Sequence, residues 1–254
     1  MYRSSGRDHL KHFEPFIDQG YIEEVIGLVK TGKEASVYAC RAGPAAGPSS
    51  EGLVAVKVFR GAQYRFKNDA VYQEARAREL GISGSALRAF NKRRHSSIGR
   101  DVQAGSWRMR EYQVLRLLHD SYADVPRPIA AEGEAILMEY FGAEDEPAPQ
   151  LNRVRVDRSE APALFQRLMN NVELFLGLNL VHGDLSPHNV LYWRGELRVI
   201  DFPQAVDPRF NNHARDILRR DVENLVRYFA PFGVEADAEA LSSDLWRRFE
   251  RAEL

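Results

Sequence analysis

One stretch, residues 180–202, constrains this chain more than any other, and it reads LVHGDLSPHNVLYWRGELRVIDF. An apolar approach leads into a polar turn, a short strand is expected at Val190 to Trp193, and a second apolar strand ends at Asp201. Two short strands joined by a tight turn bring their flanking loops to one edge. We therefore expect the side chains of Asp184, Asn189 and Asp201 to lie near one another.

These three residue types suit phosphoryl transfer. A carboxylate accepts the proton of an attacking hydroxyl, while a carboxylate and an amide oxygen are hard ligands for Mg²⁺ (or Mn²⁺) that bridges phosphate oxygens. Taken singly, each residue has a local explanation, because Asp and Asn often cap turns and strand ends. That explanation does not account for the set at this spacing. The sequence predicts Asp184 and Asp201 as catalytic residues, and Asn189 and Asp201 as metal ligands.

Composition indicates an ordinary globular chain. Its 254 residues are 44% hydrophobic, enough for one large domain or two lobes around a cleft. The formal net charge of −1 gives no global attraction to nucleic acid or membrane. The single cysteine, Cys40, excludes an internal disulfide and is expected in a buried strand. Neither a signal peptide nor a long apolar run is visible, so we expect a cytoplasmic protein without membrane contact.

The amino-terminal half begins with a charged lead-in, residues 1–20, that has room for a short helix. Strands are then expected at Tyr21 to Val29 and at Ser36 to Arg41, joined by a polar turn. Backbone N–H groups of this turn, with Thr31 and Lys33, could face phosphate oxygens, as could the Ser36 hydroxyl. A plain hairpin turn explains the same residues, so this signal is weak alone.

The next segment, residues 42–52, is rich in Ala, Gly, Pro and Ser and is typical of a flexible connector. It precedes an expected strand at Leu53 to Phe59, LVAVKVF, with Lys57 in its middle. Such a lysine either reaches solvent from an edge strand or is buried beside a fixed anion. Beside the downstream motif we favour the second interpretation. Lys57 resembles the kinase lysine that contacts phosphates and pairs with a glutamate on the following helix.

A helix predicted at Gly105 to His119 supplies that glutamate, and Glu111 is the candidate. A long insert, residues 61–104, separates it from Lys57. The insert contains the basic run RAFNKRRH at residues 88–95. A solvated surface segment is the ordinary interpretation of such a run. The alternative is a docking patch for RNA phosphates, such as those of a ribosomal precursor, or for an acidic partner, with binding that weakens as salt rises.

A hairpin is expected next, with strands at Ile129 to Ala131 and Ala135 to Phe141, before a loop that we take as the connector between two lobes. We expect lobes at residues 21–140 and 141–254. In kinases the adenine ring lies at this connector, hydrogen-bonded to backbone groups. The prediction places adenine against Glu139 to Phe141, with Met138 behind it.

Two amphipathic helices are predicted in the second half, at Ser159 to Leu180 and at Ala214 to Phe229. The first should bury Leu164, Leu168, Met169, Val172, Phe175 and Leu176; the second should bury Ile217, Leu218, Leu225, Val226 and Phe229. Asp221 lies on the second helix among charged neighbours. It forms either an exposed ion pair or a buried anchor for the loop around Asp184.

These motifs together resemble the RIO family of atypical protein kinases over nearly the whole chain. TGKEASVY, which runs from Thr31 to Tyr38, is similar to the family's phosphate loop, and VAVKVF to its lysine strand. HGDLSPHN is similar to its catalytic loop, and IDFPQ, from Ile200 to Gln204, to its metal loop. The resemblance also implies a second lobe without the peptide-binding subdomain that ordinary protein kinases carry after the metal loop.

The resemblance implies an α+β fold of two lobes: an antiparallel sheet with one main helix, then a mainly α-helical lobe. It implies ATP as co-substrate, Mg²⁺ as metal and a protein serine or threonine as acceptor, autophosphorylation included; the substrate itself is not indicated. Phosphate-loop contacts would come from Thr31, Gly32, Lys33, Ser36 and Val37. In this family the residue matching Asp201 is also associated with an aspartyl-phosphate, so an ATPase that switches a binding state in ribosome assembly is the alternative.

A small-molecule phosphotransferase of the aminoglycoside or choline kinase type shares the HGDLxxxN loop and the IDF strand. The TGKEASVY loop and the small carboxy-terminal part, which leaves little room for a substrate subdomain, favour the RIO resemblance instead. A pseudokinase is disfavoured because Lys57, Asp184, Asn189 and Asp201 are all present.

Overall fold

The structure is a computed structural model that describes residues 11–60 and 97–254. Within these residues the chain forms two compact units. The first contains residues 11–60, 97–119 and Pro126–Ala148, and the second contains Asp120–Val125 and Pro149–Leu254. Because the chain leaves the first unit and returns to it, each unit is assembled from segments distant in sequence.

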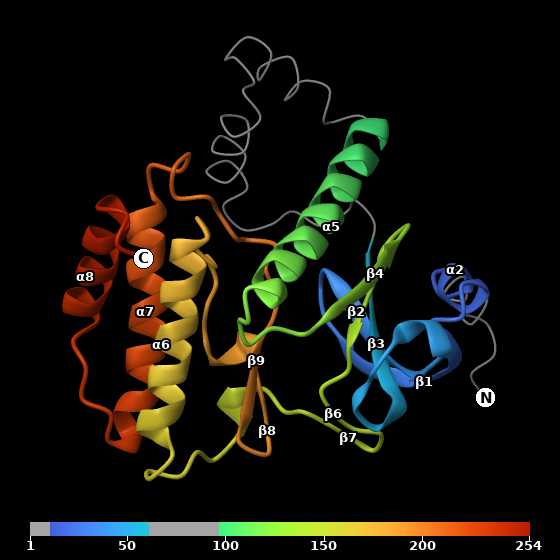
Figure 1. The fold of residues 1–254 in the computed structure, drawn as a ribbon, viewed down its shortest axis with the longest axis horizontal. Coiled ribbons are helices and arrows are strands. Elements are labelled where there is room, and N and C mark those ends of the chain that lie inside the picture. Colours follow the sequence, from blue (N-terminus) through green and yellow to red (C-terminus); the bar gives the residue numbers. More distant parts are fainter. Residues whose placement is uncertain (1–10, 61–96) are drawn as a thin grey trace. The chain divides into compact units, whose positions relative to one another are not determined.

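An antiparallel sheet of five strands forms most of the first unit (Figure 1), in the order β1-β2-β3-β5-β4. Its strands are β1 Ile22–Thr31, β2 Ala35–Ala42, β3 Leu53–Phe59, β4 Pro128–Glu132 and β5 Ala135–Glu139. The predicted strands are all present, with ends that differ by no more than a residue or two. Strand β3 lies at the centre, which explains its nearly continuous apolar sequence.

The core of this unit includes the lead-in. Helix α2, Glu14–Asp18, buries Phe16 completely, and Phe13 just before it is also buried. Both rings belong to the same hydrophobic cluster as Val54 and Val56 of β3. A cluster of this kind gains roughly 1.5–3 kcal/mol for each large side chain removed from water. Residues before β1 therefore contribute to the core of the first unit.

The expectation of a flexible connector at residues 42–52 is wrong. This segment contains a single 3₁₀ turn, Pro44–Ala46, and Ala46 is buried in the core cluster. The Arg127 guanidinium donates hydrogen bonds to the carbonyl oxygens of Ala46 and Pro48, at 3.1 and 2.6 Å. The composition suggested flexibility, but a partner far away in sequence satisfies the backbone and fixes it.

Helix α5 spans Ser97–Asp120 and so begins earlier than the predicted helix. Residues 97–104, which we assigned to the insert, are therefore helical. Val114, Leu115 and Leu118 of this helix are buried. The rest of the insert, with the basic run 88–95 and the proposed RNA contact, lies outside the described residues.

A small β-hairpin follows β5, with β6 at Gly142–Ala143 and β7 at Glu146–Pro147. Gly142 has φ +128°, and a Cβ atom there would lie 2.5 Å from the Ala148 nitrogen. Only glycine fits this close backbone approach.

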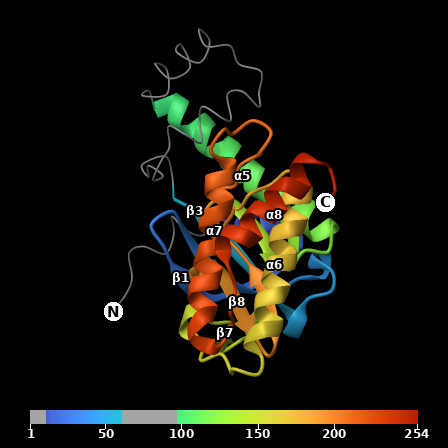
Figure 2. The same ribbon diagram turned by 90° about the vertical axis from the view of Figure 1, so that its left-hand side faces the viewer.

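Three helices lie side by side in the second unit (Figures 1 and 2): α6 Ala161–Gly177, α7 Ala214–Phe229 and α8 Ala238–Glu250. The apolar residues predicted for α6 are all buried. On α7 the same holds except for Val226, which is only partly buried. Helix α8 was not predicted, although Asp237 caps it by accepting hydrogen bonds from the Glu239 and Ala240 amides, an ordinary helix-start signal.

The predicted hairpin is present as β8, Val190–Trp193, and β9, Glu196–Val199, although β9 ends two residues before Asp201. Both turn residues, Arg194 and Gly195, have positive φ angles, of 50° and 87°. This is the conformation of the two-residue turns that suit the twist of a hairpin.

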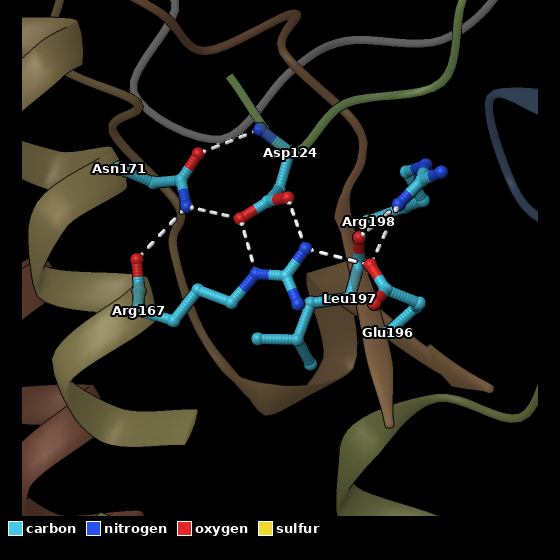
Figure 3. Close-up of polar contacts among 6 residues, drawn as sticks. All are labelled: Asp124, Arg167, Asn171, Glu196, Leu197 and Arg198. Carbon is cyan, nitrogen blue, oxygen red and sulfur yellow. Dashed lines mark hydrogen bonds and ion pairs between the residues drawn. The ribbon is translucent and has the colours of Figure 1, made fainter. Parts of the chain in front are cut away.

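A polar cluster fixes this hairpin to α6 (Figure 3). The Arg167 guanidinium donates to both carboxylate oxygens of Asp124, at 2.8 and 2.6 Å, and to Glu196 at 2.7 Å. The Asn171 side chain donates to the Asp124 carboxylate and accepts from the Asp124 backbone, each at 2.8 Å. The Asp124 carbonyl in turn accepts from the Val199 amide at 2.6 Å. One aspartate thus joins the chain after α5 to helix α6 and strand β9.

No helix among the described residues is both long enough and apolar enough to cross a membrane.

We expect Asp124→Asn to lower the free energy of unfolding at pH 7 by about 1–2 kcal/mol, between the usual values for exposed and buried ion pairs. Burial raises the pKa of Asp124, but hydrogen bonds from Arg167 and Asn171 and the Arg167 charge outweigh it and hold that pKa below its usual range. A lowered pKa stabilises the folded state above the unfolded-state pKa of about 4, and this contribution is lost as pH falls through the folded-state value.

Urea unfolding followed by circular dichroism at several values between pH 7 and pH 3 measures this effect. The variant should lose less stability than the parent as pH falls through the acid range. Glu235→Gln is the control, since Glu235 is an exposed carboxylate of the same unit. Equal pH dependence in the parent and Asp124→Asn would contradict the assignment.

Candidate active site

Lys57 and Glu111 form an ion pair in the first unit. Lys57 lies in β3 opposite Val37 of β2 and Ile136 of β5. Its Nζ atom is 2.6 Å from the Glu111 Oε1 atom on α5, and the two side chains are 12% and 3% exposed. An ammonium so well enclosed needs a fixed anion. The structure therefore contains the buried lysine and the glutamate partner that the sequence indicated.

The predicted phosphate loop is a tight turn between β1 and β2. The Gly32 amide donates to the Ala35 carbonyl at 2.8 Å, and Thr31 pairs with Ser36 across the hairpin. Their hydroxyl oxygens lie 3.4 Å apart. The turn therefore brings two hydroxyl groups together at the end of the strand pair.

Arg60 is a residue that sequence analysis missed at this turn. Its backbone amide donates to the Glu34 carbonyl at 2.8 Å, and its guanidinium lies 3.4 Å from the Ser36 hydroxyl. Arg60 directly follows β3, so only the pairing of β2 with β3 brings it to the turn. The sequence alone carried no signal for this contact.

The segment predicted to hold adenine lies at the end of β5. Met138 is buried, and the Glu139 backbone amide donates to the Arg127 carbonyl at 2.8 Å. The Phe141 carbonyl accepts from the Ala148 amide at 3.0 Å. Two of the backbone groups in this segment are thus already paired within the first unit.

Asp184 and Asn189 meet in the second unit. Asn189 ends a single 3₁₀ turn, Pro187–Asn189. Its side-chain Nδ2 atom donates to the Asp184 backbone carbonyl at 2.8 Å and to the Asp184 carboxylate at 3.1 Å. The Asp184 side chain is exposed. Because both amide hydrogens point toward Asp184, the Asn189 Oδ1 atom faces away from it as an acceptor.

Asp201 follows β9 and is tied to the same turn through its neighbour. The Ile200 amide donates to the Asn189 carbonyl at 2.9 Å. Asp201 itself has φ +74°, a conformation uncommon for residues other than glycine. Residues with such strained backbone conformations occur mostly at functional sites, where the surrounding structure holds them in place. The second unit thus links all three residues of the central motif.

The loop before Asp184 packs against the chain after Asp201. Val181 and Val206 exchange two backbone hydrogen bonds of 2.9 Å. Gly183 has φ +86°, and a Cβ atom there would lie 2.4 Å from the Gln204 carbonyl oxygen. Glycine is required at residue 183 because no side chain fits between the two loops.

His182 bridges these two loops. Its Nε2 atom lies 3.1 Å from the Ile200 carbonyl, its Nδ1 atom lies 3.3 Å from the Asp184 amide, and its ring is 4.6 Å from the Phe202 ring. Burial lowers the pKa of His182 against the opposing effect of the Ile200 carbonyl and the nearby Asp201 and Asp184 charges. A neutral ring with its proton on Nε2 satisfies both contacts.

The sequence left two interpretations of Asp221 open, an exposed ion pair or a buried anchor, and the structure shows the buried anchor. It is 1% exposed, and its carboxylate accepts hydrogen bonds from the Gly183 amide at 2.8 Å and the Leu185 amide at 3.0 Å. Burial raises the pKa of Asp221 to about 7, against the opposing effects of the two amides and of Arg220. Asp221 therefore holds the backbone on both sides of Asp184.

Two further α7 residues contact the same loop and were not singled out by sequence analysis. Arg220 donates to the Gly183 carbonyl at 2.7 Å, and Asn224 donates to the Leu185 carbonyl at 2.9 Å. Residues 220, 221 and 224 occupy one face of a helix. Three polar side chains on the same face as buried apolar ones are the signal that could have indicated this contact.

The donor set of the second unit suits a hard divalent cation held partly by a substrate. Among the described residues, no three His, Cys, Asp or Glu side chains gather to hold a metal ion by themselves. Mg²⁺ needs no such cage, since it is commonly held by one or two protein oxygens, phosphate oxygens and water. An Asp201 carboxylate and an Asn189 amide oxygen fit that pattern.

The family model described as RIO domain matches residues 36–241 of this chain. Similar curated proteins carry RIO names. The RIO-type serine/threonine-protein kinase Rio1 of Haloferax volcanii is 30% identical over 228 residues, covering 89% of this chain and 70% of the relative. Rio1 of Thermoplasma acidophilum is 29% identical, with 76% and 93% covered. Human serine/threonine-protein kinase RIO1 is 30% identical, but this chain spans only 34% of its length.

Solved structures share the fold. The Rio2 kinase of Chaetomium thermophilum, in a complex described as ADP/Mg²⁺-phosphoaspartate, superposes with a TM-score of 0.65 at 17% identity. The match covers 94% of this chain and 67% of that one. This likeness shows a kinase-like fold of two lobes, with a sheet in the first and mainly helices in the second. With the family match over most of the sequence, it follows that this chain belongs to the RIO family of atypical serine/threonine protein kinases.

Proposed function

We propose that the chain binds ATP with Mg²⁺ and transfers the γ-phosphoryl group to a serine or threonine hydroxyl of a protein. The observation that carries this proposal is the arrangement in the second unit, where Asn189 contacts Asp184 directly and bonds through its backbone to the residue before Asp201. That geometry joins a proton acceptor and two oxygen ligands on neighbouring loops. Phosphoryl transfer relies mainly on positioning and electrostatic stabilisation, which such an arrangement supplies.

Nucleotide binding is assigned to the first unit. Lys57, oriented by Glu111, would contact the phosphates, and the turn from Thr31 through Gly32 and Lys33 to Ser36 and Val37 would enclose them. Adenine would lie against Met138, Glu139 and Phe141. The 2.6 Å ion pair supports the first of these roles, because it fixes the ammonium of a central strand.

The metal would be Mg²⁺ or Mn²⁺, held by Asn189 and Asp201. A bound cation neutralises negative charge on the phosphates and on the transferring group. Asp184 would orient the acceptor hydroxyl and accept its proton, since its carboxylate is exposed and is positioned by Asn189. The hydrogen bond from Asn189 also restrains the Asp184 carboxylate.

A second outcome of the same chemistry is an acyl phosphate on Asp201. The phosphoaspartate in the related Rio2 complex supports it, as does the unusual backbone conformation of Asp201 in this chain. In that case ATP hydrolysis would proceed through the aspartyl-phosphate and switch the protein between two binding states.

Lys57→Met should raise the Kd for ATP about tenfold or more and lower kcat, because it removes the only charge of the pair that can attract phosphate. It should also destabilise the fold by about 3–5 kcal/mol, since Glu111 is left buried without its cation. Lys57→Met/Glu111→Leu should recover much of that stability but none of the ATP affinity. Calorimetric ATP titration and thermal unfolding measure the two effects separately, and unchanged ATP affinity in Lys57→Met would contradict the role.

Asp184→Asn should abolish phosphoryl transfer, by about 10³-fold or more if Asp184 both accepts the proton and orients the hydroxyl. ATP affinity should stay within about twofold, because the proposal gives Asp184 no contact with the nucleotide. Transfer of labelled phosphate to the protein itself or to a generic acceptor is the measurement. Asp216→Asn, which changes an exposed carboxylate at the start of α7, is the matched control. Full activity in Asp184→Asn would remove Asp184 from the chemistry.

The two outcomes of the reaction differ in the bond that holds the label. Incubation with Mg²⁺ and γ-labelled ATP should give label that is stable to acid and hydroxylamine and that disappears in Asp184→Asn. Hydroxylamine cleaves acyl phosphates but not phosphate esters. Label that hydroxylamine releases, and that disappears in Asp201→Asn, would assign the protein to the ATPase switch instead.

A further inference from the structure

Helix α7 contacts the loop around Asp184 through side chains alone. Gly183 and Leu185 are buried, so their backbone N–H and C=O groups need partners inside the protein. A helix cannot offer its own backbone, because its N–H and C=O groups bond to each other. Polar side chains on α7 must supply every such bond that the helix makes to this loop.

Three α7 residues meet this requirement with four hydrogen bonds. Asp221 accepts from the amides of Gly183 and Leu185, at 2.8 and 3.0 Å. Arg220 donates to the Gly183 carbonyl at 2.7 Å, and Asn224 donates to the Leu185 carbonyl at 2.9 Å. Both polar groups of each residue that flanks Asp184 are therefore held by one rigid helix.

Asp184 lies between the two residues that are held. Its own backbone is fixed from elsewhere, with its amide near His182 and its carbonyl accepting from Asn189. A carboxylate at the centre of such a network has little freedom to shift or turn. Rigid support of this kind matters in phosphoryl transfer, where displacement of a reacting group by about 1 Å costs up to 100-fold in rate.

We infer that Arg220 and Asn224 are positioning residues for the reaction, which act with Asp221 to set the location of Asp184 through the backbone on either side of it. This inference rests on the proposed role of Asp184. Neither side chain would touch ATP or the acceptor. Their removal should therefore lower kcat and leave nucleotide binding unchanged, a pattern that a general loss of stability does not produce.

The test uses Arg220→Met and Asn224→Leu, which keep side-chain size and remove the donor. In each variant kcat should fall about 10- to 100-fold, while the Kd for ATP stays within about twofold. Arg220→Lys should restore part of kcat, since an ammonium can still donate to the Gly183 carbonyl. The double variant should lose less than the product of the single losses, because both residues act on one segment.

Arg227→Met is the matched control, since Arg227 is an exposed cation on the same helix and should show the kcat of the parent. Thermal unfolding of every variant separates positioning from stability. Normal kcat in Arg220→Met and Asn224→Leu at a temperature where they are fully folded would overturn the inference, even if their melting temperatures were lower.

Hydrogen–deuterium exchange tests the structural part without reference to activity. Both variants should accelerate exchange of the Gly183 and Leu185 amides, while exchange in β8 remains as in the parent. Unchanged exchange at these amides overturns the inference. If the parent transfers no phosphoryl group at all but exchange accelerates in the variants, the proposed function fails while the attachment of the loop to α7 stands.

Discussion

The backbone around Asp184 lies in the protein interior, and its need for hydrogen-bond partners determines much of the second unit. An unpaired N–H or C=O group in such a place costs about 1–3 kcal/mol. Strands satisfy this need with one another, but the Asp184 loop is not part of a sheet. The loop depends instead on Asp221 of α7, on His182 and on Asn189. This need explains why α7 has a polar face toward the core. Burial of the Asp221 carboxylate on that face raises its pKa to about 7.

The first unit meets the equivalent need with a sheet. Strands β2 and β5 both pair with β3 in antiparallel register, so the backbone groups of β3 have hydrogen-bond partners. The polar group of β3 that still needs a partner is the Lys57 side chain. Glu111 meets that need from α5, more than fifty residues later in the sequence. The two units thus position their functional groups by different means. In the second unit, side chains hold the backbone around Asp184. In the first unit, the pairing of β3 with its neighbours holds Lys57 in place.

The sequence predicted what depends on local patterns. Period-two and 3.6-residue patterns placed the strands of the sheet, the β8–β9 hairpin and helices α6 and α7, and motif spacing indicated Lys57 and Asp184. Contacts between distant segments were mostly not visible, and the Lys57–Glu111 pair was expected only because of its place among the motifs. The segment at residues 42–52 resembles a linker until Arg127 binds its carbonyls, and Arg60 reaches Ser36 only through strand pairing. Asp221 could be placed on a helix, but whether it was buried depended on which loop packed against that helix.

Negative charge is concentrated where the second unit holds its central loop. The charges of Asp201 and Asp184 both act to raise the pKa of His182, and the Asp184 charge also acts to raise that of Asp221. Carboxylates that influence one another in this way repel, and folding has to overcome that repulsion. The fold therefore holds Asp184 and Asp221 close enough for the charge of one to disfavour the charge of the other, and this repulsion is part of the cost of placing Asp184 in this loop.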